Sequence, residues 1–518
     1  MKRILAFRPK SFTPGPTLIE KESRPEGFTR SLGARTFTGT LWILGERFYR
    51  QIIFLLNAAI LGRLLGPHDF GLVGYGTLAI HLLGVFTYTG FAEALVQRSS
   101  LGVRTIQTGW WVMVGRAAVI ALILFFIAPV VALRVQEPEV TRVLQALAGV
   151  YLLTACSSIG TTLLYKEMRF QKIFQIEASA ITLDLMTAIV AALIWRNVWA
   201  LVLGAGVGAL TRVALSYIIY PIRPRLIFDL NEAWKLFQFG QWLLYGGALY
   251  FMETKGTEML SGFLYGATGL GLYQIASRFA LLPSTHVGET FFQALFPTYS
   301  HLQDEPEKLR GAFLRVLQVA TFIIFPLSAL MAVVAGPIIP LIMGPQWQGV
   351  VNLVPGLALG GALLALIRTA PPLLMATGKP KYQFFLDLNC AAGLLVSIYP
   401  LYRLGGLSGL PWAYALGFFS GLPLWWRLVR RQSQAGSRDL LISLGPAVLA
   451  SLLLVISIEG FMSIFHLQLM NWRALAWVLP LGAGSLVLYL CTILAMERLL
   501  PGYQPVQNSW RLIKGVVQ

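Results

Sequence analysis

The chain is dominated by long apolar stretches, and their length restricts what it can fold into. A helix needs roughly 20 mostly apolar residues to cross a bilayer. Only 12% of the residues are charged, whereas soluble domains carry roughly 25%. Fourteen stretches are long enough, at residues 39–62, 70–92, 109–133, 143–163, 175–195, 199–220, 236–260, 270–296, 313–335, 350–376, 383–402, 408–427, 441–463 and 474–496. We therefore predict an all-α polytopic membrane protein with about 14 transmembrane helices.

The positive charge is concentrated in the segments between these stretches. Most of the 41 Lys and Arg residues fall in segments that an even number of spans places on the same side as the N-terminus. Because basic loops remain in the cytoplasm, we expect both termini to be cytoplasmic. The net charge of +18 therefore does not indicate nucleic-acid binding, which needs a basic face on a folded domain.

The spans divide into two groups of six with two left over. Spans one to six form a predicted N-lobe, residues 36–222, and spans seven to twelve a pseudo-repeated C-lobe, residues 236–430, joined by a cytoplasmic linker at 223–235. Residues 431–518 contain two extra spans and the cytoplasmic C-terminus. Residues 1–35 are basic and lack an apolar core, so we expect a disordered cytoplasmic tail that contacts anionic lipid.

A stretch of 40 residues occurs twice, 200 positions apart, at Leu61–Ser100 and Ser261–Ser300. The matched positions include Gly62/Gly262, Gly66/Gly266 and Gly71/Gly271. Repeats inside a membrane predict two lobes with a path between them, which is how secondary transporters are built.

Ionisable side chains interrupt several spans, and such residues normally face a polar interior rather than lipid. Arginine suits phosphate because its planar guanidinium donates two parallel hydrogen bonds. We therefore predict a water-filled cavity for an anionic, phosphorylated substrate. The candidate substrate-binding residues are Arg47, Arg50, Arg116, Arg212, Arg278 and Arg368. Ion pairs that only hold helices together are the alternative for each, such as Glu46 with Arg50 one helical turn away.

Carboxylates within the spans permit a second role. Glu46, Asp184, Glu253 and Asp387 are candidates for binding a proton or sodium ion that drives movement. Structural pairing is an equal alternative for each of them. The sequence contains no phosphate-loop, GxSxG or HExxH signature, and the exterior segments are too short for a catalytic domain. We predict no enzyme activity, no cofactor and no metal site.

The residues after the first span resemble those of a known family. Arg63-Leu64-Leu65-Gly66-Pro67, followed by Asp69-Phe70-Gly71, resembles the end of the first span in polysaccharide exporters of the multidrug/oligosaccharidyl-lipid/polysaccharide exporter superfamily. Gly344 with Trp347 and Ala376-Thr377-Gly378-Lys379-Pro380 fit the same family. The resemblance implies two six-helix lobes around a central cavity in a bacterial inner membrane. It implies flipping of lipid-linked precursors for lipopolysaccharide, O-antigen or capsule.

The resemblance also implies a substrate and roles for some residues. The substrate would be a polyprenyl-diphosphate-linked glycan, with polysaccharide assembly proteins as candidate partners. By position, Arg47 or Arg50 and Arg278 match cationic residues that engage the diphosphate in related flippases. The chain departs from the peptidoglycan-precursor flippases, which carry Arg-Asp where this chain has Glu46-Arg47.

Our hypothesis is a flippase that works by alternating access without ATP. One alternative keeps the fold and changes the cargo, making the chain a cation-coupled multidrug exporter, although cationic drugs would favour carboxylates over arginines. The other is a membrane glycosyltransferase or polymerase, which the short exterior segments disfavour.

Overall fold

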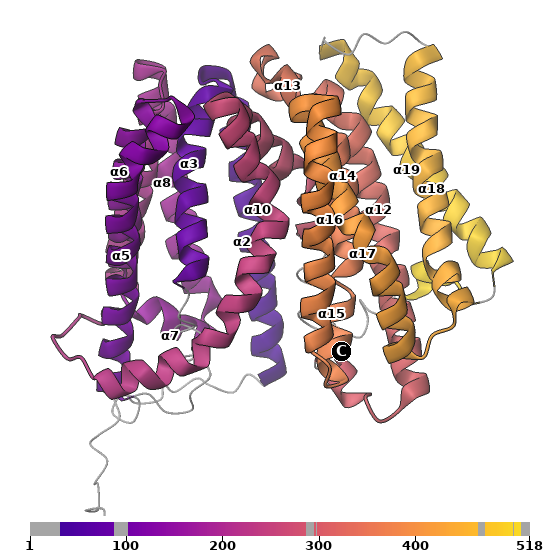
Figure 1. The fold of residues 1–518 in the computed structure, drawn as a ribbon, viewed down its shortest axis with the longest axis horizontal. Coiled ribbons are helices and arrows are strands. Elements are labelled where there is room, and N and C mark those ends of the chain that lie inside the picture. The colour runs from indigo at the N-terminus through magenta and orange to yellow at the C-terminus, as the bar shows by residue number, and fades with distance from the viewer. Residues whose placement is uncertain are drawn as a thin grey trace, which may run out of the picture.

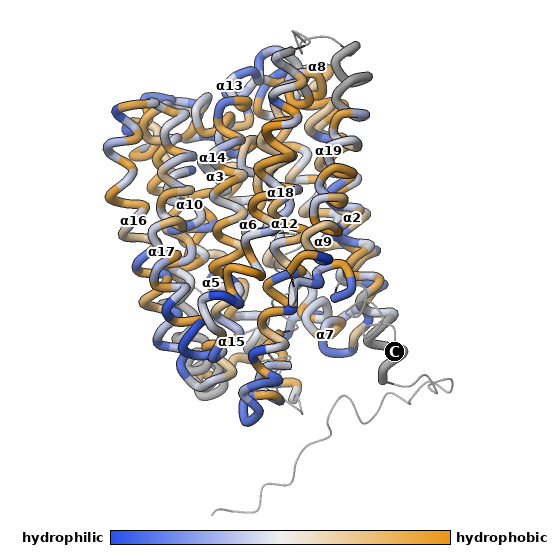
Figure 2. The backbone as a smooth tube through the Cα atoms, turned by 90° about the vertical axis from the view of Figure 1, so that its right-hand side faces the viewer, coloured by the Kyte–Doolittle hydropathy of each residue, from blue (hydrophilic) through white to orange (hydrophobic). Residues whose placement is uncertain are grey.

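The computed structural model describes residues 32–87, 102–285, 295–296, 298–464, 472–500 and 502–508, and the regular structure in these ranges is helical. Figure 1 shows long helices in two bundles, one from the earlier and one from the later part of the chain. Hydrophobic residues extend along the helices, and hydrophilic residues gather toward the ends of the bundles (Figure 2). Most of the predicted tail, residues 1–31, lies outside the described residues.

Nine helical stretches of the described chain are long and apolar enough to cross a membrane, or ten if one bent pair counts as a span. One of them, Lys381–Ser433, holds two successive helices. The predicted spans one and seven and the start of span eight lie in helices α2 and α10, which are not among the nine, and part of span eight lies outside the described residues. The all-α polytopic architecture is confirmed, whereas the number of about 14 spans stays a prediction.

The first bundle, which we call the N-lobe, contains the helices that precede residue 220. They are α2 (Leu32–Leu64), α3 (Pro67–Phe86), α5 (Val103–Val135), α6 (Glu139–Ala155), α7 (Gly160–Lys166), α8 (Phe170–Trp195) and α9 (Trp199–Ile219). As the sequence predicted, the chain turns at Gly66 and Pro67 between α2 and α3. The backbone N–H of Gly66 donates to Asp69 Oδ2 (3.1 Å), which caps α3.

The fourth predicted span, residues 143–163, is not one straight helix. Helices α6 and α7 are bent by 58°. At this break the backbone N–H of Ser158 donates to Ser216 Oγ (2.8 Å), and the Ser158 hydroxyl donates to the carbonyl oxygen of Tyr220 (2.9 Å). These hydrogen bonds reach α9 and its C-terminal end, and they compete with continuation of the helix. The bend therefore depends on a contact that the local apolar pattern does not show.

The part of the chain that we call the C-lobe follows an extended segment after α9. Its first helix, α10 (Leu230–Ala280), lies beside the first bundle in Figure 1, next to α3. Its other elements are α12 (Pro306–Met343), η2 (Pro345–Trp347), α13 (Gln348–Val351), α14 (Val354–Ile367), α15 (Ala370–Ala376), α16 (Lys381–Gly405), η3 (Gly406–Ser408) and α17 (Gly409–Ser433). Two further helices, α18 (Ser437–Ile464) and α19 (Trp472–Leu499), complete the described chain. The hydroxyl of Tyr489 on α19 donates to the carbonyl oxygen of Phe322 on α12 (2.9 Å), which ties these two helices to the C-lobe.

Helix α10 contains the predicted seventh and eighth spans and folds back on itself. Its helical backbone breaks at Gly266, where φ is 66° and ψ is −163°, a conformation that glycine adopts without a Cβ clash. The Tyr273 hydroxyl donates to Thr257 Oγ1 (2.7 Å), although a straight helix would place these residues about 24 Å apart. The two arms of α10 therefore run antiparallel, as two successive spans do.

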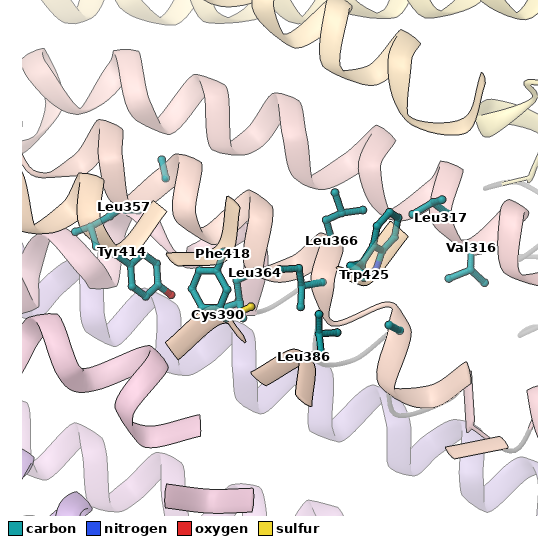
Figure 3. Close-up of a cluster of buried hydrophobic side chains, with 14 of the residues drawn as sticks. Val316, Leu317, Leu357, Leu364, Leu366, Leu386, Cys390, Tyr414, Phe418 and Trp425 are labelled. Atoms are coloured by element: carbon teal, nitrogen blue, oxygen red, sulfur yellow. The ribbon is translucent and has the colours of Figure 1, made fainter. Parts of the chain in front are cut away.

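The C-lobe core lies between α12, α14, α16 and α17. Trp425 and Phe418 of α17 are only 1% and 2% exposed. Figure 3 shows these rings among Leu364 and Leu366 of α14 and Leu386 of α16. Burial of such aromatic and branched side chains holds the four helices together as one unit.

The two copies of the repeated stretch meet at the seam between the lobes. Gly71 on α3 lies against the backbone of Ala267, and Gly271 on α10 lies against the backbone of Pro67. A Cβ at either glycine would clash with a carbonyl oxygen. The two contacts are reciprocal, because positions 67 and 71 of the first copy correspond to positions 267 and 271 of the second. Such reciprocity is expected for segments that are related by a two-fold axis. The repeat therefore forms the interface between the lobes.

Candidate functional site

Four of the charged side chains in the N-lobe form one group, which we call the N-lobe ion cluster: Glu46, Arg50, Glu177 and Arg212. Arg50 Nη2 lies 2.8 Å from Glu46 Oε1 and 2.9 Å from Glu177 Oε2. Arg212 donates to both oxygens of Glu177, over 2.9 and 3.0 Å. The cluster joins α2, α8 and α9, and its two cations balance its two carboxylates. The side chain of Arg50 is 45% exposed.

Small residues of α9 bring this cluster together. A Cβ at Gly204 would lie 2.6 Å from Asp184 Oδ1, and Gly208 also lies against Asp184 on α8. Close approach of two helices is the usual result of small residues spaced four apart. One helical turn after Gly208, Arg212 therefore reaches Glu177 on α8. Asp184 is half-buried in this helix contact.

A second group, which we call the C-lobe ion cluster, consists of Glu253, Arg368 and Asp387. Arg368 lies at the break between α14 and α15 and contacts Glu253 of α10 (2.7 Å) and Asp387 of α16 (3.2 Å). Its guanidinium carbon is 5.0 Å from the centre of the Tyr250 ring. The side chains of Arg368, Glu253 and Asp387 are 18%, 2% and 8% exposed.

The C-lobe ion cluster is incompletely satisfied. Glu253 Oε1 and Arg368 Nε are buried without a hydrogen-bond partner in the part of the chain that the structure describes. One guanidinium also faces two carboxylates. Unpaired buried polar atoms are costly, so the described residues leave both the charge and the hydrogen bonds of this cluster incompletely balanced.

Arg278 stands apart from both clusters. It lies on the second arm of α10 and is exposed. Its guanidinium carbon is 5.5 Å from the centre of the Phe54 ring on α2, across the seam. Among the described residues, no ion pair with Arg278 is formed, and Glu258, on the first arm, pairs with Lys255 (2.6 Å). Within the part of the chain that the structure describes, Arg278 is therefore an exposed cation at the seam without an ion pair.

The remaining predicted residues lie elsewhere in the N-lobe. Arg116 on α5 donates to the Tyr151 hydroxyl on α6 over 3.4 Å. Arg47 is half-buried on α2, next to Glu46. The structure thus places Glu46, Arg50 and Arg212 in one cluster and Glu253, Arg368 and Asp387 in another. Their functional roles stay predictions.

Sequence reasoning missed Glu177, which holds the N-lobe ion cluster together by bonding to two arginines. Its signal was present, because a carboxylate within the predicted fifth span needs a cationic partner.

In the described ranges, no three His, Cys, Asp or Glu side chains are grouped closely enough to hold a metal ion.

A set of hydrogen bonds, which we call the latch, closes the seam at the end that carries Gly66. Arg63 at the end of α2 donates to the carbonyl oxygens of Ile342 (2.9 Å) and Leu341 (2.5 Å) near the end of α12. Trp347 Nε1 and Gln346 Nε2 donate to the carbonyl oxygen of Gly62, over 2.7 and 2.8 Å. The latch joins two motifs on which the family resemblance depends. The reciprocal glycine contacts lie at the same end, so both hold the lobes together there.

A sequence profile of the polysaccharide biosynthesis protein family matches residues 60–352, more than half of the chain. The chain belongs to this family. The matched range includes the latch and both copies of the glycine contacts. The recognition of a polysaccharide exporter from the sequence is therefore confirmed.

Two curated relatives extend the match of this polysaccharide biosynthesis protein. The lipopolysaccharide biosynthesis protein WzxC of Escherichia coli (strain K12) is 26% identical over 68% of this chain and 72% of its own length. The succinoglycan biosynthesis transport protein ExoT of Rhizobium meliloti (strain 1021) is 24% identical over 91% of this chain and 95% of its own length.

Solved structures show the same fold. The lipid II flippase MurJ, in an inward closed conformation, has a TM-score of 0.66 at 14% identity and is covered over 99% of its length, against 89% of this chain. An inward-facing multidrug resistance MATE family transporter of the MOP superfamily has a TM-score of 0.55 at 14% identity. The match covers 74% of this chain and 94% of that one. At this identity the likeness shows the fold of this family member and not its cargo.

Proposed function

We propose that this protein is a flippase that moves a lipid-linked oligosaccharide or polysaccharide precursor across the cytoplasmic membrane by alternating access, without ATP. One observation carries the proposal. The lobes are closed at the latch end, and Arg278 lies about 16 Å farther along its helix from the contact at Ala267, exposed and outside any described ion pair. An exposed arginine between two lobes is suited to an anionic group that passes between them.

The relatives support the class of cargo. WzxC and ExoT are named for lipopolysaccharide biosynthesis and for succinoglycan biosynthesis transport. MurJ, which shares the fold, is a lipid II flippase. A polyprenyl-diphosphate-linked glycan combines a polysaccharide precursor with a lipid and an anionic group, so it fits both kinds of relative and the arginine at the seam. A multidrug exporter or a glycosyltransferase would agree less well with the roles of WzxC, ExoT and MurJ.

We assign the first contact with the diphosphate to Arg278. Arg50 is the second candidate, because its side chain is 45% exposed although it is ion-paired. Arg212 donates two hydrogen bonds to Glu177. The side chain of Arg368 is only 18% exposed within the C-lobe ion cluster. These two arginines are better placed to hold helices together than to bind cargo.

The C-lobe ion cluster is our candidate for coupling to an ion. Its carboxylates outnumber its guanidinium, and Glu253 Oε1 has no hydrogen-bond partner in the described chain. A proton or a sodium ion at Glu253 or Asp387 would balance the charge. Arrival and departure of that ion would change the contacts between α10, α14 and α16, which is how such a site can drive movement.

Orientation in the membrane follows from the basic residues. Arg427, Arg430 and Arg431 lie at the end of α17 that is opposite the latch, and Lys166 ends α7 at the same end. By the positive-inside rule, we place this end in the cytoplasm and the latch outside. Both termini are then cytoplasmic, in a bacterial inner membrane.

The decisive experiment replaces Arg278 in a strain that lacks the chromosomal gene, with surface polysaccharide as the readout. Arg278→Ala is expected to lower it by about tenfold or more, the usual loss when a charged contact is removed. Arg278→Lys keeps the charge and should retain part of the activity. Arg403→Ala is the control, because Arg403 is exposed on α16 and contacts Tyr399 on the same helix. Full activity of Arg278→Ala at normal protein level would reject this assignment, and a change in drug resistance alone would favour a multidrug exporter.

A further inference from the structure

A groove runs along the face of the C-lobe between α16 and α17, away from the seam. Figure 1 shows these two helices side by side. The groove consists of two adjoining cavities of about 750 and 410 Å³, which share Asn389 and Ser420 in their walls. We call the larger cavity the lower groove and the smaller one the upper groove.

The groove exists because small residues let the two helices approach. A Cβ at Gly393 of α16 would clash with the Ser420 hydroxyl of α17, and one at Gly417 would lie 2.9 Å from Leu394 Cβ. Ala392 and Gly393 line the upper groove, and their small side chains leave space above them. Larger side chains form its rims, among them Phe419. The small residues thus form the floor of a groove with larger side chains on either side.

The upper groove is apolar and faces outward. Val396 and Phe419 in its walls are 77% and 58% exposed. Leu416, also in the wall, is 44% exposed. Helices α16 and α17 form one of the stretches that are apolar enough to cross a membrane. Side chains of this kind on a membrane-spanning surface contact lipid chains.

The lower groove is basic. Arg427, Arg430 and Arg431 line it, together with Trp426. The three arginines are exposed and follow one another at helical spacing, so their like charges lie on one face of α17. In the described chain none of them has a carboxylate within 4.0 Å. Trp426 is half-buried, in the kind of position that tryptophan takes at a membrane surface.

Several other basic residues at this end of the protein have partners. Arg310 pairs with Asp439, and Lys379 donates to Gln432 Oε1 over 3.0 Å. Lys308 pairs with Glu305. The arginines of the lower groove thus differ from their neighbours, and a phosphate group would supply the missing anion through paired hydrogen bonds.

We propose that the groove between α16 and α17 binds one anionic phospholipid, with its phosphate on Arg427, Arg430 and Arg431 and an acyl chain in the upper groove. The order of the parts matches that of a phospholipid. The apolar upper groove would hold the acyl chain, the polar junction at Asn389 and Ser420 the glycerol, and the basic lower groove the phosphate. The bound lipid fixes the end of α17 next to the connection to α18. This site is independent of the cargo site at the seam.

The test uses the purified full-length protein in detergent and native mass spectrometry. Phosphatidylglycerol and phosphatidylcholine with identical acyl chains are added separately, and inorganic phosphate is added alone. We expect the wild-type protein to retain phosphatidylglycerol at least about tenfold better than phosphatidylcholine, because several arginines contribute to the attraction. Inorganic phosphate alone should not be retained, because it lacks the chain.

Two variants and one control complete the test. R427Q/R430Q/R431Q should remove the preference for phosphatidylglycerol. A392W, which fills the upper groove, should weaken retention of both lipids. R104Q/R225Q/R438Q removes three other exposed arginines and should bind like the wild type. Unchanged selectivity in the first variant, equal loss in the control, or retention of inorganic phosphate as tight as that of phosphatidylglycerol would overturn the proposal. None of these results depends on the flipping activity.

Discussion

The two lobes each contain an ion cluster, and the clusters differ in charge balance and in burial. In the N-lobe ion cluster two arginines face two glutamates, and Arg50 is 45% exposed. In the C-lobe ion cluster one arginine faces two carboxylates, and Glu253 is 2% exposed. The repeat in the sequence therefore does not extend to the charged residues, although it produces reciprocal contacts at the seam.

The difference separates a structural cluster from one that can change its state. Exposed and balanced ion pairs contribute little, about 0–1 kcal/mol each, because water screens them. Buried charges are stable only when each is paired and hydrogen-bonded. The N-lobe ion cluster meets that condition and the C-lobe ion cluster does not. The C-lobe ion cluster therefore has an excess carboxylate, which the N-lobe ion cluster lacks.

The largest effect on stability is expected from Arg368→Ala. This change leaves Glu253 and Asp387 buried without a cation, and removal of one partner from a buried pair costs about 3–5 kcal/mol. The variant should show a lower yield of monodisperse protein and a lower apparent melting temperature in detergent. The control is E253Q/R368M/D387N, which removes the charges together and should recover most of the loss. A melting temperature of Arg368→Ala equal to that of the wild type would show that the cluster is solvated.

Glu177→Ala is expected to have an intermediate effect. It leaves Arg50 and Arg212 without their shared partner, and the two guanidinium groups then repel each other. The cost should be about 1–3 kcal/mol, typical of a partly buried charged hydrogen bond. Thermal unfolding followed by tryptophan fluorescence measures it. Glu305→Ala serves as the comparison, because Glu305 pairs with Lys308 at the surface (2.5 Å) and should change little. A larger effect for Glu177→Ala than for Arg368→Ala would reverse the ranking of the two clusters.

Arg50→Ala is expected to have a small effect on stability. Its side chain is 45% exposed, and Glu177 keeps both hydrogen bonds from Arg212. The loss should be about 0.2–1 kcal/mol, as for other solvated pairs. If surface polysaccharide nevertheless falls strongly at normal protein level, Arg50 contacts the cargo. If neither quantity changes, Arg50 is not part of the cargo site, and Arg278 stays the first candidate.

Much of the fold could be predicted from local patterns. Apolar length predicted a chain of helices, many of them long enough to cross a membrane, and the four-residue spacing predicted the Glu46–Arg50 pair (2.8 Å). These features depend on residues that are near each other in the sequence. The bend between α6 and α7 does not, because Ser158 reaches Ser216, 58 residues later.

The composition of the clusters was harder to predict for the same reason. Arg368 meets Glu253 across 115 residues, and Arg50 meets Glu177 across 127. A single sequence shows that buried charges need partners, but it does not show which of several carboxylates each arginine meets. Packing of α10, α14 and α16 makes that choice in the C-lobe.

Glu253→Gln is expected to have the smallest effect on stability and the most specific effect on transport. The change removes the excess negative charge, and Gln keeps an acceptor for Arg368 Nη2, which lies 2.7 Å from Glu253 Oε2. The weaker bond to Arg368 and the removal of the excess negative charge should roughly cancel in the free energy of unfolding. The melting temperature should therefore change no more than it does for an ordinary surface substitution. Transport should lose its response to the coupling ion, measured as polysaccharide export at different external pH or sodium concentration. Glu46→Gln in the balanced N-lobe ion cluster should keep that response. If both variants kept it, the excess charge of the C-lobe ion cluster would have no part in coupling.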